Sequence, residues 1–354
     1  MSSEASGQPR YNKGEWAELL ALAKLLCEGS VSVGVFNADS SARHLQVTSI
    51  SRTSSVREEF IIDSENVRIS ADGRVVSRKD ICVRVTNLLP AIRVGNWAVS
   101  ASEGAELLTM FGIQQLKIGT DKADLYLNVL DPLTGASGLQ GYSVKSFLGS
   151  APTLFNASLS TNFTYTVTPS IPHGELARYN TLRTREMCRE LLDAGHSFRL
   201  IDHHPGFGAN LSILDARMVD VIAHSLVAYY SKRCGTEAGL SAIANYLGVV
   251  NPLAVGNPSV FYRYKFMDLL EAITYGMTPT KQWDGQRSAP GGLLIVDKKG
   301  DLTCIQAGNS DGHREYLLQS TKFDTPSRSK HQFGHLYQRD GESHLRLNLQ
   351  IRYR

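Results

Sequence analysis

The sequence predicts an α/β fold of the α+β kind, and three observations carry that prediction. Short alternating apolar runs separated by polar turns fill residues 31–100 and return near the C-terminus. Segments with apolar residues at helical spacing occupy the start of the chain and much of the stretch 179–275. The chain has 354 residues, 42% of them hydrophobic, which suffices for one large domain or two smaller ones.

The first part of the chain combines helices with short strands. Apolar residues recur at helical spacing within 14–28, so we expect a helix there. Asn12 can cap its start, Glu15 follows three residues later at capping-box spacing, and Gly29 can end it. Strands are predicted at 31–36, 60–62, 81–85, 125–130 and 142–147, with a short helix at 103–110.

The second part is predicted to be mainly helical and to end in β structure. Helices are predicted at 179–194, 211–230, 237–247 and 264–275, and hairpins at 293–305 and around a turn at 339–342. We therefore expect a flexible N-terminus over 1–11, a core with a β subregion over 12–175, and a helical and β part over 176–354. The last two parts are expected to pack as one globular unit.

Composition excludes several classes of protein. The net charge is +3, but residues 321–354 alone hold seven Lys/Arg against three Asp/Glu, a local basic patch suited to phosphates. The five cysteines form no CxxC pair, so we expect reduced thiols, no disulfide and no zinc finger. The polar N-terminus is no signal peptide, and no apolar run approaches bilayer length. These features predict a soluble cytoplasmic protein without a membrane partner.

Asp124 and Lys145 form the most informative pair of residues. They lie on two strand-like segments joined by the Gly- and Pro-containing turn 131–138. A carboxylate that holds Mg²⁺ beside an ammonium group is what phosphodiester hydrolysis needs. Lysine can orient the attacking water or screen developing charge. The alternative is an ordinary exposed acid and lysine on a surface hairpin.

The pattern lacks one acid. Mg²⁺-dependent nucleases commonly carry Asp, a variable loop and then Asp/Glu-x-Lys, whereas Ser143 stands two residues before Lys145 here. Glu15 and Glu18 are three residues apart on one helix face, and either could reach the metal. The alternative role of Glu15 is the capping box, and Glu18 could simply be an exposed glutamate on the helix surface. Gln140, which is closer to Ser143 in the sequence, is a further polar candidate.

Two segments are candidates for contact with nucleic acid. The stretch 146–158 is rich in small hydroxyl residues that let backbone N–H groups approach a phosphate, with side chains such as Ser146, Ser150 and Asn156. The C-terminal stretch 344–354 alternates apolar and polar residues, and its polar face carries side chains that can pair with base edges. An ordinary strand with a solvated basic face is the alternative. The candidate contacts in this region are Arg328, Lys330, His331, Arg346, Asn348, Gln350 and Arg352.

Several blocks in fixed order resemble the HpaII family of type II restriction endonucleases. They are 12–19, 142–158, Asn210-Leu211 with Ile213 and Asp215, 276–281, 324–331 and 345–352. The resemblance implies a PD-(D/E)XK-like core, a mixed central sheet flanked by helices, with additional β-rich N-terminal and DNA-binding C-terminal parts. It implies Asp124 as metal ligand, Lys145 as catalytic lysine, and Glu15 or Glu18 as the helix-borne acid. Ser143 belongs to the catalytic set as a family trait.

The expected function is Mg²⁺-dependent cleavage of both strands of double-stranded DNA at a short palindrome, with CCGG as the sequence that the resemblance suggests. A cognate DNA methyltransferase would protect the host, and a palindromic target suggests a homodimer. Two alternatives remain open. One is a sequence-specific DNA-binding protein with a decayed catalytic site, which Ser143 motivates, and the other is a structure- or damage-directed nuclease with the same core.

Overall fold

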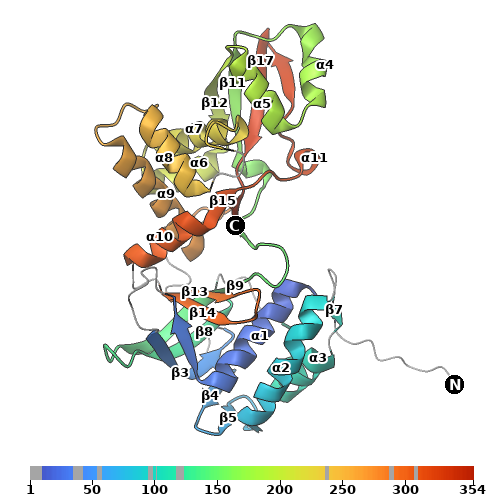
Figure 1. Ribbon diagram of the computed structural model, residues 1–354, viewed down its shortest axis with the longest axis vertical. Helices are drawn as coiled ribbons and strands as arrows, with labels where there is room; N and C mark the ends of the chain where they lie inside the picture. The colour runs from blue at the N-terminus through green and yellow to red at the C-terminus, as the bar shows by residue number, and fades with distance from the viewer. Residues whose placement is uncertain are drawn as a thin grey trace, which may run out of the picture. The chain divides into compact units, whose positions relative to one another are not determined.

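The computed structural model describes residues 10–34, 43–53, 58–94, 99–100, 102–116, 123–235, 239–286, 291–306 and 310–354. Helices and strands are interspersed along the chain, which confirms the predicted mixture of α and β structure. They form two compact units, Met1–Pro152 with Arg287–His313 and Thr153–Gln286 with Arg314–Arg354 (Figure 1). Of the predicted flexible segment 1–11, residues 1–9 lie outside the described part of the chain.

Six strands of the first unit close into a barrel. Around the ring the order is β2, β14, β13, β9, β8 and β3, and β3 pairs back with β2. Strands β9 and β13 are parallel, as are β14 and β2, and the other ring pairs are antiparallel. The strands of this unit are β1 (Arg10–Tyr11), β2 (Ser30–Val33), β3 (Arg43–Ser51), β4 (Glu59–Ile62), β5 (Asn66–Ile69), β6 (Val75–Ser77), β7 (Val99–Ser100), β8 (Leu125–Leu130), β9 (Ser137–Ser146), β13 (Gly292–Val296) and β14 (Leu302–Gln306).

Three helices lie together beside this sheet: α1 (Lys13–Glu28), α2 (Arg78–Val94) and α3 (Ser102–Phe111) (Figure 1). Helix α1 begins with the predicted capping box, in which Asn12 and Glu15 each accept the other's backbone N–H. It ends at Gly29, whose φ of 66° is left-handed and favours glycine. Both helix ends were therefore predicted correctly. Helix α1 is buried along most of its length, which places it in the core of this unit.

The prediction of a strand at 81–85 is wrong. These residues belong to α2, in which Ile81, Leu88 and Ile92 are fully buried. Their spacing of seven and four residues is helical. A window of five residues shows only alternation, and the helical period needs a longer window.

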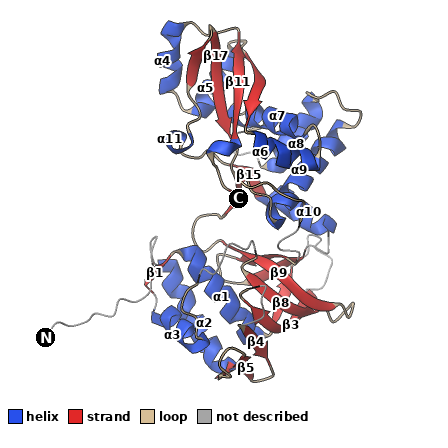
Figure 2. Ribbon diagram, turned by 180° about the vertical axis from the view of Figure 1, so that it is seen from behind, coloured by secondary structure: helices blue, strands red, loops and turns tan. Residues whose placement is uncertain are grey.

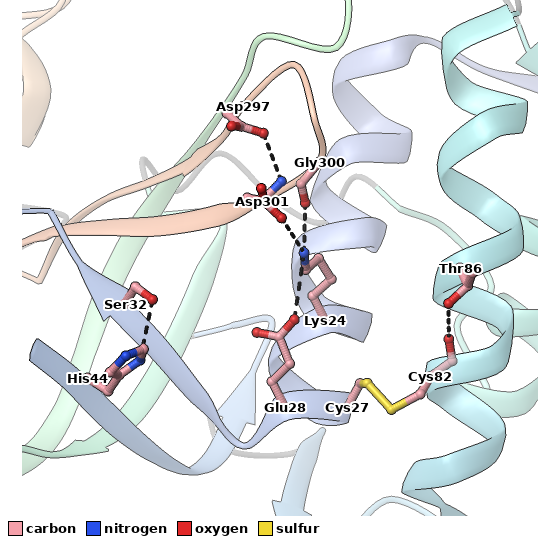
Figure 3. A network of polar contacts seen from close by, with 10 residues as sticks. All are labelled: Lys24, Cys27, Glu28, Ser32, His44, Cys82, Thr86, Asp297, Gly300 and Asp301. Atoms are coloured by element: carbon pink, nitrogen blue, oxygen red, sulfur yellow. Dashed lines mark hydrogen bonds and ion pairs between the residues drawn. A yellow bond between two sulfur atoms is a disulfide. The ribbon is translucent and has the colours of Figure 1, made fainter. Parts of the chain in front are cut away.

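Cys27 of α1 and Cys82 of α2 form a disulfide, with their Cα atoms 5.2 Å apart (Figure 3). The expectation that every cysteine is reduced is therefore wrong for this pair, because helix packing joins cysteines that are 55 residues apart. One turn earlier, Lys24 Nζ donates to the Gly300 carbonyl at 2.9 Å and lies 3.6 Å from the Glu28 carboxylate. Helix α1 is thus tied to α2 and to the β13–β14 turn.

The second unit contains two small sheets and most of the helices. One sheet has the order β12, β11, β17, β16, and the other β10, β18, β15. The strands are β10 (Thr153–Phe155), β11 (Asn162–Thr168), β12 (Ser197–His203), β15 (Thr321–Phe323), β16 (Leu336–Arg339), β17 (Glu342–Asn348) and β18 (Ile351–Tyr353). The helices are α4 (His173–Thr181), α5 (Thr184–Asp193), α6 (Pro205–Leu214), α7 (Met218–Tyr230), α8 (Leu240–Val250), α9 (Pro258–Tyr275), α11 (Arg328–His331) and the short η1 (Leu159–Thr161), while α10 (Ser310–Ser320) belongs partly to each unit.

Two predicted helices are each interrupted. The segment 179–194 spans α4 and α5, because Leu182 and Arg183 are extended. The segment 211–230 spans α6 and α7, because Asp215 is extended and its carboxylate accepts the Arg217 N–H at 2.7 Å. Such an Asp turn competes with the helix for backbone hydrogen bonds. Apolar spacing continues across both breaks, which is why periodicity alone missed them.

The predicted C-terminal strand is also divided. Strand β17 ends at Asn348 and β18 begins at Ile351, and the two belong to different sheets. Between them, the Leu349 N–H donates to the Thr161 carbonyl at 3.0 Å. The polar residues of this stretch therefore do not form one continuous face.

The units divide the chain differently from the predicted boundary at 175/176. The first unit ends at Pro152, and the hairpin β13–β14 rejoins it from 140 residues downstream because β13 pairs in parallel with β9. Such long-range pairing leaves no local compositional signal. Among the described residues, none of the helices combines the length and apolarity that crossing a membrane requires.

Candidate active site

Asp124 and Lys145 are brought together at one end of the β8–β9 hairpin. The Asp124 N–H donates to the Tyr142 carbonyl at 2.8 Å, and the Val144 N–H donates to Asp124 Oδ2 at 2.7 Å. Because Val144 directly precedes Lys145, this bond holds the carboxylate beside the lysine's strand position. Strand β9 pairs with β8 on one edge and β13 on the other. The lysine therefore lies on a strand that is paired on both edges, and the acid directly precedes the neighbouring strand β8.

Ser143, which stands where other nucleases of this pattern carry an acid, is buried. Ser143 is only 1% exposed and pairs in register with Leu293 of β13. Its short side chain supplies no carboxylate to the site. The amide oxygen of Gln140 accepts a hydrogen bond from the Tyr142 hydroxyl at 3.1 Å, and an amide supplies no negative charge. A second carboxylate would therefore come from another element.

Glu18 of α1 is the candidate for this second acid. The pKa of Glu18 is raised from 4.5 to about 8, mainly by burial and then by the charge of Asp124, while the charge of Lys145 acts in the opposite direction. A carboxyl that responds to both Asp124 and Lys145 lies within their electrostatic range. The structure therefore brings three of the predicted residues, Glu18, Asp124 and Lys145, into one cluster. A strongly shifted carboxyl beside a charged partner is typical of a functional site.

Glu15 has a different role. Its carboxylate accepts the Asn12 N–H at 2.8 Å, and the Asn12 side chain accepts the Glu15 N–H at 3.0 Å. These bonds satisfy two N–H groups at the start of α1. Glu15 adds negative charge near Glu18, but its carboxylate is used to begin the helix.

The donor set fits Mg²⁺. Among the described residues, no group of three or more His, Cys, Asp or Glu side chains could hold a metal ion. Mg²⁺ does not need such a group, because it keeps several waters and binds through one or two carboxylates and a phosphate. Asp124 and Glu18 are two such carboxylates, and part of the shift in the Glu18 pKa is their mutual repulsion. A divalent cation between them would relieve that repulsion.

Arg52 is a further member of this cluster that sequence reasoning missed. It follows β3, is 8% exposed, and its Nη2 donates to the Gln115 and Leu116 carbonyls at 2.5 and 2.6 Å. Burial lowers the pKa of Arg52, while the charges of Glu58 and then Glu18 raise it, and the charge of Arg52 in turn lowers the pKa of Glu18. Arg52 therefore holds the segment that precedes Asp124 and adds positive charge near Glu18. A single arginine after a strand carries no recognisable sequence signal.

We expect Arg52→Gln to slow cleavage by more than about tenfold and to raise the Mg²⁺ concentration needed for half-maximal rate. The buried carbonyls would lose a charged donor, worth roughly 1.5–3 kcal/mol, and Glu18 would lose a compensating positive charge. Single-turnover cleavage across a Mg²⁺ series measures both effects. Arg43→Gln, at the other end of β3, breaks the ion pair with Asp131 and serves as control. A lower melting temperature with an unchanged Mg²⁺ requirement would reduce Arg52 to a structural residue.

The predicted phosphate-binding stretch 146–158 connects the two units. The Ser146 hydroxyl accepts the Leu148 N–H at 3.2 Å, and Ser150 and Asn156 are exposed. At the end of the stretch, Ser158 caps the short helix η1. Contact of these side chains with DNA stays a prediction.

The predicted contacts around α11 differ in accessibility. Arg328 donates to the Leu182 carbonyl at 2.8 Å and to the Gly334 carbonyl, so its guanidinium holds the fold together. Lys330 is exposed. His331 is partly buried, and burial with the nearby Lys330 charge lowers its pKa.

The predicted base-reading residues of the C-terminal stretch are mostly engaged within the unit. Asn348 is 1% exposed, and its amide donates to the Ser158 carbonyl and to Asn162 Oδ1 at 2.8 and 2.7 Å. Arg352 pairs with the Asp324 carboxylate at 2.9 Å, and Gln350 is partly buried. Arg346 alone among these four is exposed. A base contact from Asn348 would require it to leave its internal hydrogen bonds.

Comparison with known proteins confirms the resemblance to the HpaII family. The family model of the HpaII restriction endonuclease matches residues 12–353. The type II restriction enzyme HpaII of Haemophilus parainfluenzae is 30% identical over 355 residues, covering 97% of this chain and 98% of that enzyme. None of the solved structures matches the chain. The matched range includes Glu18, Asp124 and Lys145.

Proposed function

The chain belongs to the HpaII restriction endonuclease family, and from that membership we propose that it is a Mg²⁺-dependent type II restriction endonuclease. It would hydrolyse both strands of double-stranded DNA at a short palindrome, with CCGG as the first sequence to test. A cognate methyltransferase would protect the same sequence. Two copies of the chain would match the twofold symmetry of a palindrome.

One observation carries the proposal. The Asp124 carboxylate is held by the Val144 N–H beside Lys145, and the Glu18 carboxyl shares their electrostatic environment. Two oxygen donors and one ammonium group are the side chains that metal-assisted phosphodiester hydrolysis uses. We therefore interpret the core as a variant of the PD-(D/E)XK pattern. In this variant Ser143 stands in the place of the second acid, and Glu18 supplies that acid from α1.

Each side chain then has a defined task. Asp124 and Glu18 would hold Mg²⁺, which when bound polarises the scissile phosphate and acidifies the attacking water. Lys145 places a positive charge where negative charge develops on the phosphate and can orient the water. Arg52 holds the chain ahead of Asp124 and offsets the charge of Glu18. Because Lys145 lies on a strand paired on both edges and Glu18 on a capped helix, these two groups would need little rearrangement during the reaction.

Plasmid DNA incubated with the protein and Mg²⁺ tests the proposal. Discrete fragments whose ends share one sequence are expected. Cleavage without a shared sequence would instead indicate a structure- or damage-directed nuclease. Binding of a defined sequence without cleavage would indicate a decayed site, the alternative that Ser143 favours.

We expect Lys145→Ala to lower the single-turnover cleavage rate by about 10²–10⁴, the usual contribution of a positioned group that handles a proton or charge. Binding of DNA measured in EDTA should be retained, because the barrel residues around Lys145 are otherwise unchanged. Lys298→Ala, in the exposed β13–β14 turn, is the matched control. Normal cleavage by Lys145→Ala would exclude the lysine from the reaction.

A further inference from the structure

The four-stranded sheet of the second unit has one covered face and one polar face. On the covered face, Phe163, Tyr165 and Leu345 are at most 1% exposed, and the Tyr165 hydroxyl donates to the Ala223 carbonyl of α7. Helix α5 lies in front of these strands in Figure 1, and Figure 2 shows them from the other side. Residues that alternate with the covered ones must point to this other side.

Strand register assigns the residues of the polar face. Thr166 of β11 pairs with Arg199 of β12 and with His344 of β17, and His344 pairs with Tyr337 of β16. Directly paired residues project from the same face of a sheet. In the neighbouring row Thr164 lies between Asp202 and Arg346. The polar face is therefore defined by Arg199, Asp202, Thr164, Thr166, Tyr337, His344 and Arg346.

Two polar atoms within this face lack a hydrogen-bond partner among the described residues. Thr166 is 3% and His344 is 6% exposed, so both are more than nine-tenths buried. Thr166 Oγ1 and His344 Nδ1 are buried and make no hydrogen bond with the described residues. Native proteins rarely leave such atoms unsatisfied. Thr166 lies on β11 between the two arginine-bearing strands and His344 lies on one of them, so a ligand bound there would complete their hydrogen bonds directly or through water.

Arg199 and Arg346 supply positive charge on the same face as Thr166 and His344. Both are exposed, and neither forms an ion pair with a described residue. Arg346 lies 5.6 Å from the centre of the Tyr337 ring, which supports its guanidinium. Other arginines of the unit, Arg233, Arg263, Arg314 and Arg352, each pair with an acid. Asp202 is the acid at the margin of the face.

The overall charge points to the same unit. The second unit holds 19 Lys/Arg against 15 Asp/Glu, whereas the first holds 18 against 19. The positive excess of the chain therefore belongs entirely to the unit that lacks Asp124 and Lys145. A polyanion is attracted by this distribution.

We propose that the polar face binds the phosphate backbone of double-stranded DNA, with Arg199 and Arg346 as the charged contacts and Thr166 and His344 as the hydrogen-bonding floor. Arginine holds a phosphate through two parallel hydrogen bonds, and hydroxyl groups add neutral ones. This inference rests on the proposed function for its ligand. It assigns contact with the DNA phosphate backbone to strands β12 and β17. It replaces the sequence-based prediction that Asn348 and Arg352 read bases.

The test measures binding without cleavage. The full chain carrying Asp124→Asn is titrated with labelled duplex DNA in EDTA over a salt series, with and without Arg199→Gln and Arg346→Gln. Each replacement should weaken binding about tenfold at low salt. It should also reduce the slope of log K against log salt by about 0.9, the value for one lost phosphate contact. Arg233→Gln, which breaks an exposed ion pair with Asp193, is the matched control.

The outcomes separate the inference from the proposed function. An equal loss on duplexes with and without CCGG, with an unchanged melting temperature, supports backbone contact. A salt slope that stays at the parent value in the double variant overturns the inference, even when the wild-type chain cleaves plasmid. Loss confined to one sequence overturns it as well, because it would show base reading. A parent chain that binds no duplex at all overturns the inference together with the proposed function.

Discussion

Asp124→Asn is expected to reduce the rate of DNA cleavage by about a thousandfold or more. The amide is nearly identical in shape and its oxygen can still accept the Val144 N–H, so the hairpin should stay intact. It removes the negative charge that would hold Mg²⁺, and a metal at a phosphate stabilises the transition state by several kcal/mol. Each 1.36 kcal/mol corresponds to a factor of ten in rate. Single-turnover cleavage at saturating Mg²⁺ measures the loss.

Asp131→Asn is the matched control, because Asp131 directly follows β8, the strand that Asp124 directly precedes. Its carboxylate is paired with Arg43 and accepts the Thr134 hydroxyl at 2.6 Å. We expect this variant to lose stability and to retain cleavage. If both variants lose activity in proportion to their lost stability, Asp124 has no special role in the reaction.

Glu18→Gln is expected to abolish cleavage and, in EDTA, to make the protein more stable at pH 8. The folded protein holds the proton of Glu18 up to a pKa of about 8, whereas the unfolded chain releases it near 4.5. Between these values the unfolded state binds fewer protons, so the stability of the wild-type protein falls as pH rises. Glutamine does not titrate and avoids this loss. The difference in melting temperature should be small at pH 4.5 and largest at pH 8 and above.

Adding Mg²⁺ should make the wild-type protein more stable than Glu18→Gln, the reverse of the order in EDTA. A cation that binds only the folded protein raises its melting temperature, and we expect a larger increase for the wild-type protein than for Glu18→Gln. Glu15→Gln is the control on the same helix, because glutamine also serves in a capping box. It should retain cleavage and show no such pH-dependent gain. A gain for Glu18→Gln that does not change with pH would contradict the raised pKa.

The two glutamates show where sequence reasoning stops. Glu15 and Glu18 are three residues apart on a helix whose start and end were both predicted correctly. Helical periodicity assigns them to one face and cannot choose between them. The choice depends on the capping bonds of Asn12 with Glu15 and on the Asp124 charge, which arrives from more than a hundred residues away. Only packing of α1 beside the β8–β9 hairpin brings that charge close.

In the C-terminal stretch, too, the local sequence does not determine which side chains are free to bind a ligand. Its alternation correctly indicates β structure, but exposure depends on which strands pair with it. Arg346 and Asn348 alternate onto the same side of β17, yet Arg346 is exposed whereas Asn348 is enclosed where it bonds to Ser158 and Asn162. Arg199 on β12 joins the same face through β11, although it is far from Arg346 in sequence. No local pattern could connect these two arginines.

The sequence by itself determined the family, the α+β class, the Asp124–Lys145 hairpin and both ends of α1. The family shows in sequence blocks spread along the chain, whereas the class, the hairpin and the helix ends depend on turn residues, caps and apolar spacing, which act within a few residues of one another. The tertiary structure alone decided that Glu18 accompanies Asp124, that Arg52 joins them, that Cys27 meets Cys82, and that β13 returns to β9. Each of these contacts joins segments distant in sequence, and their free energy comes from burial and pairing that exist only once the whole unit has folded.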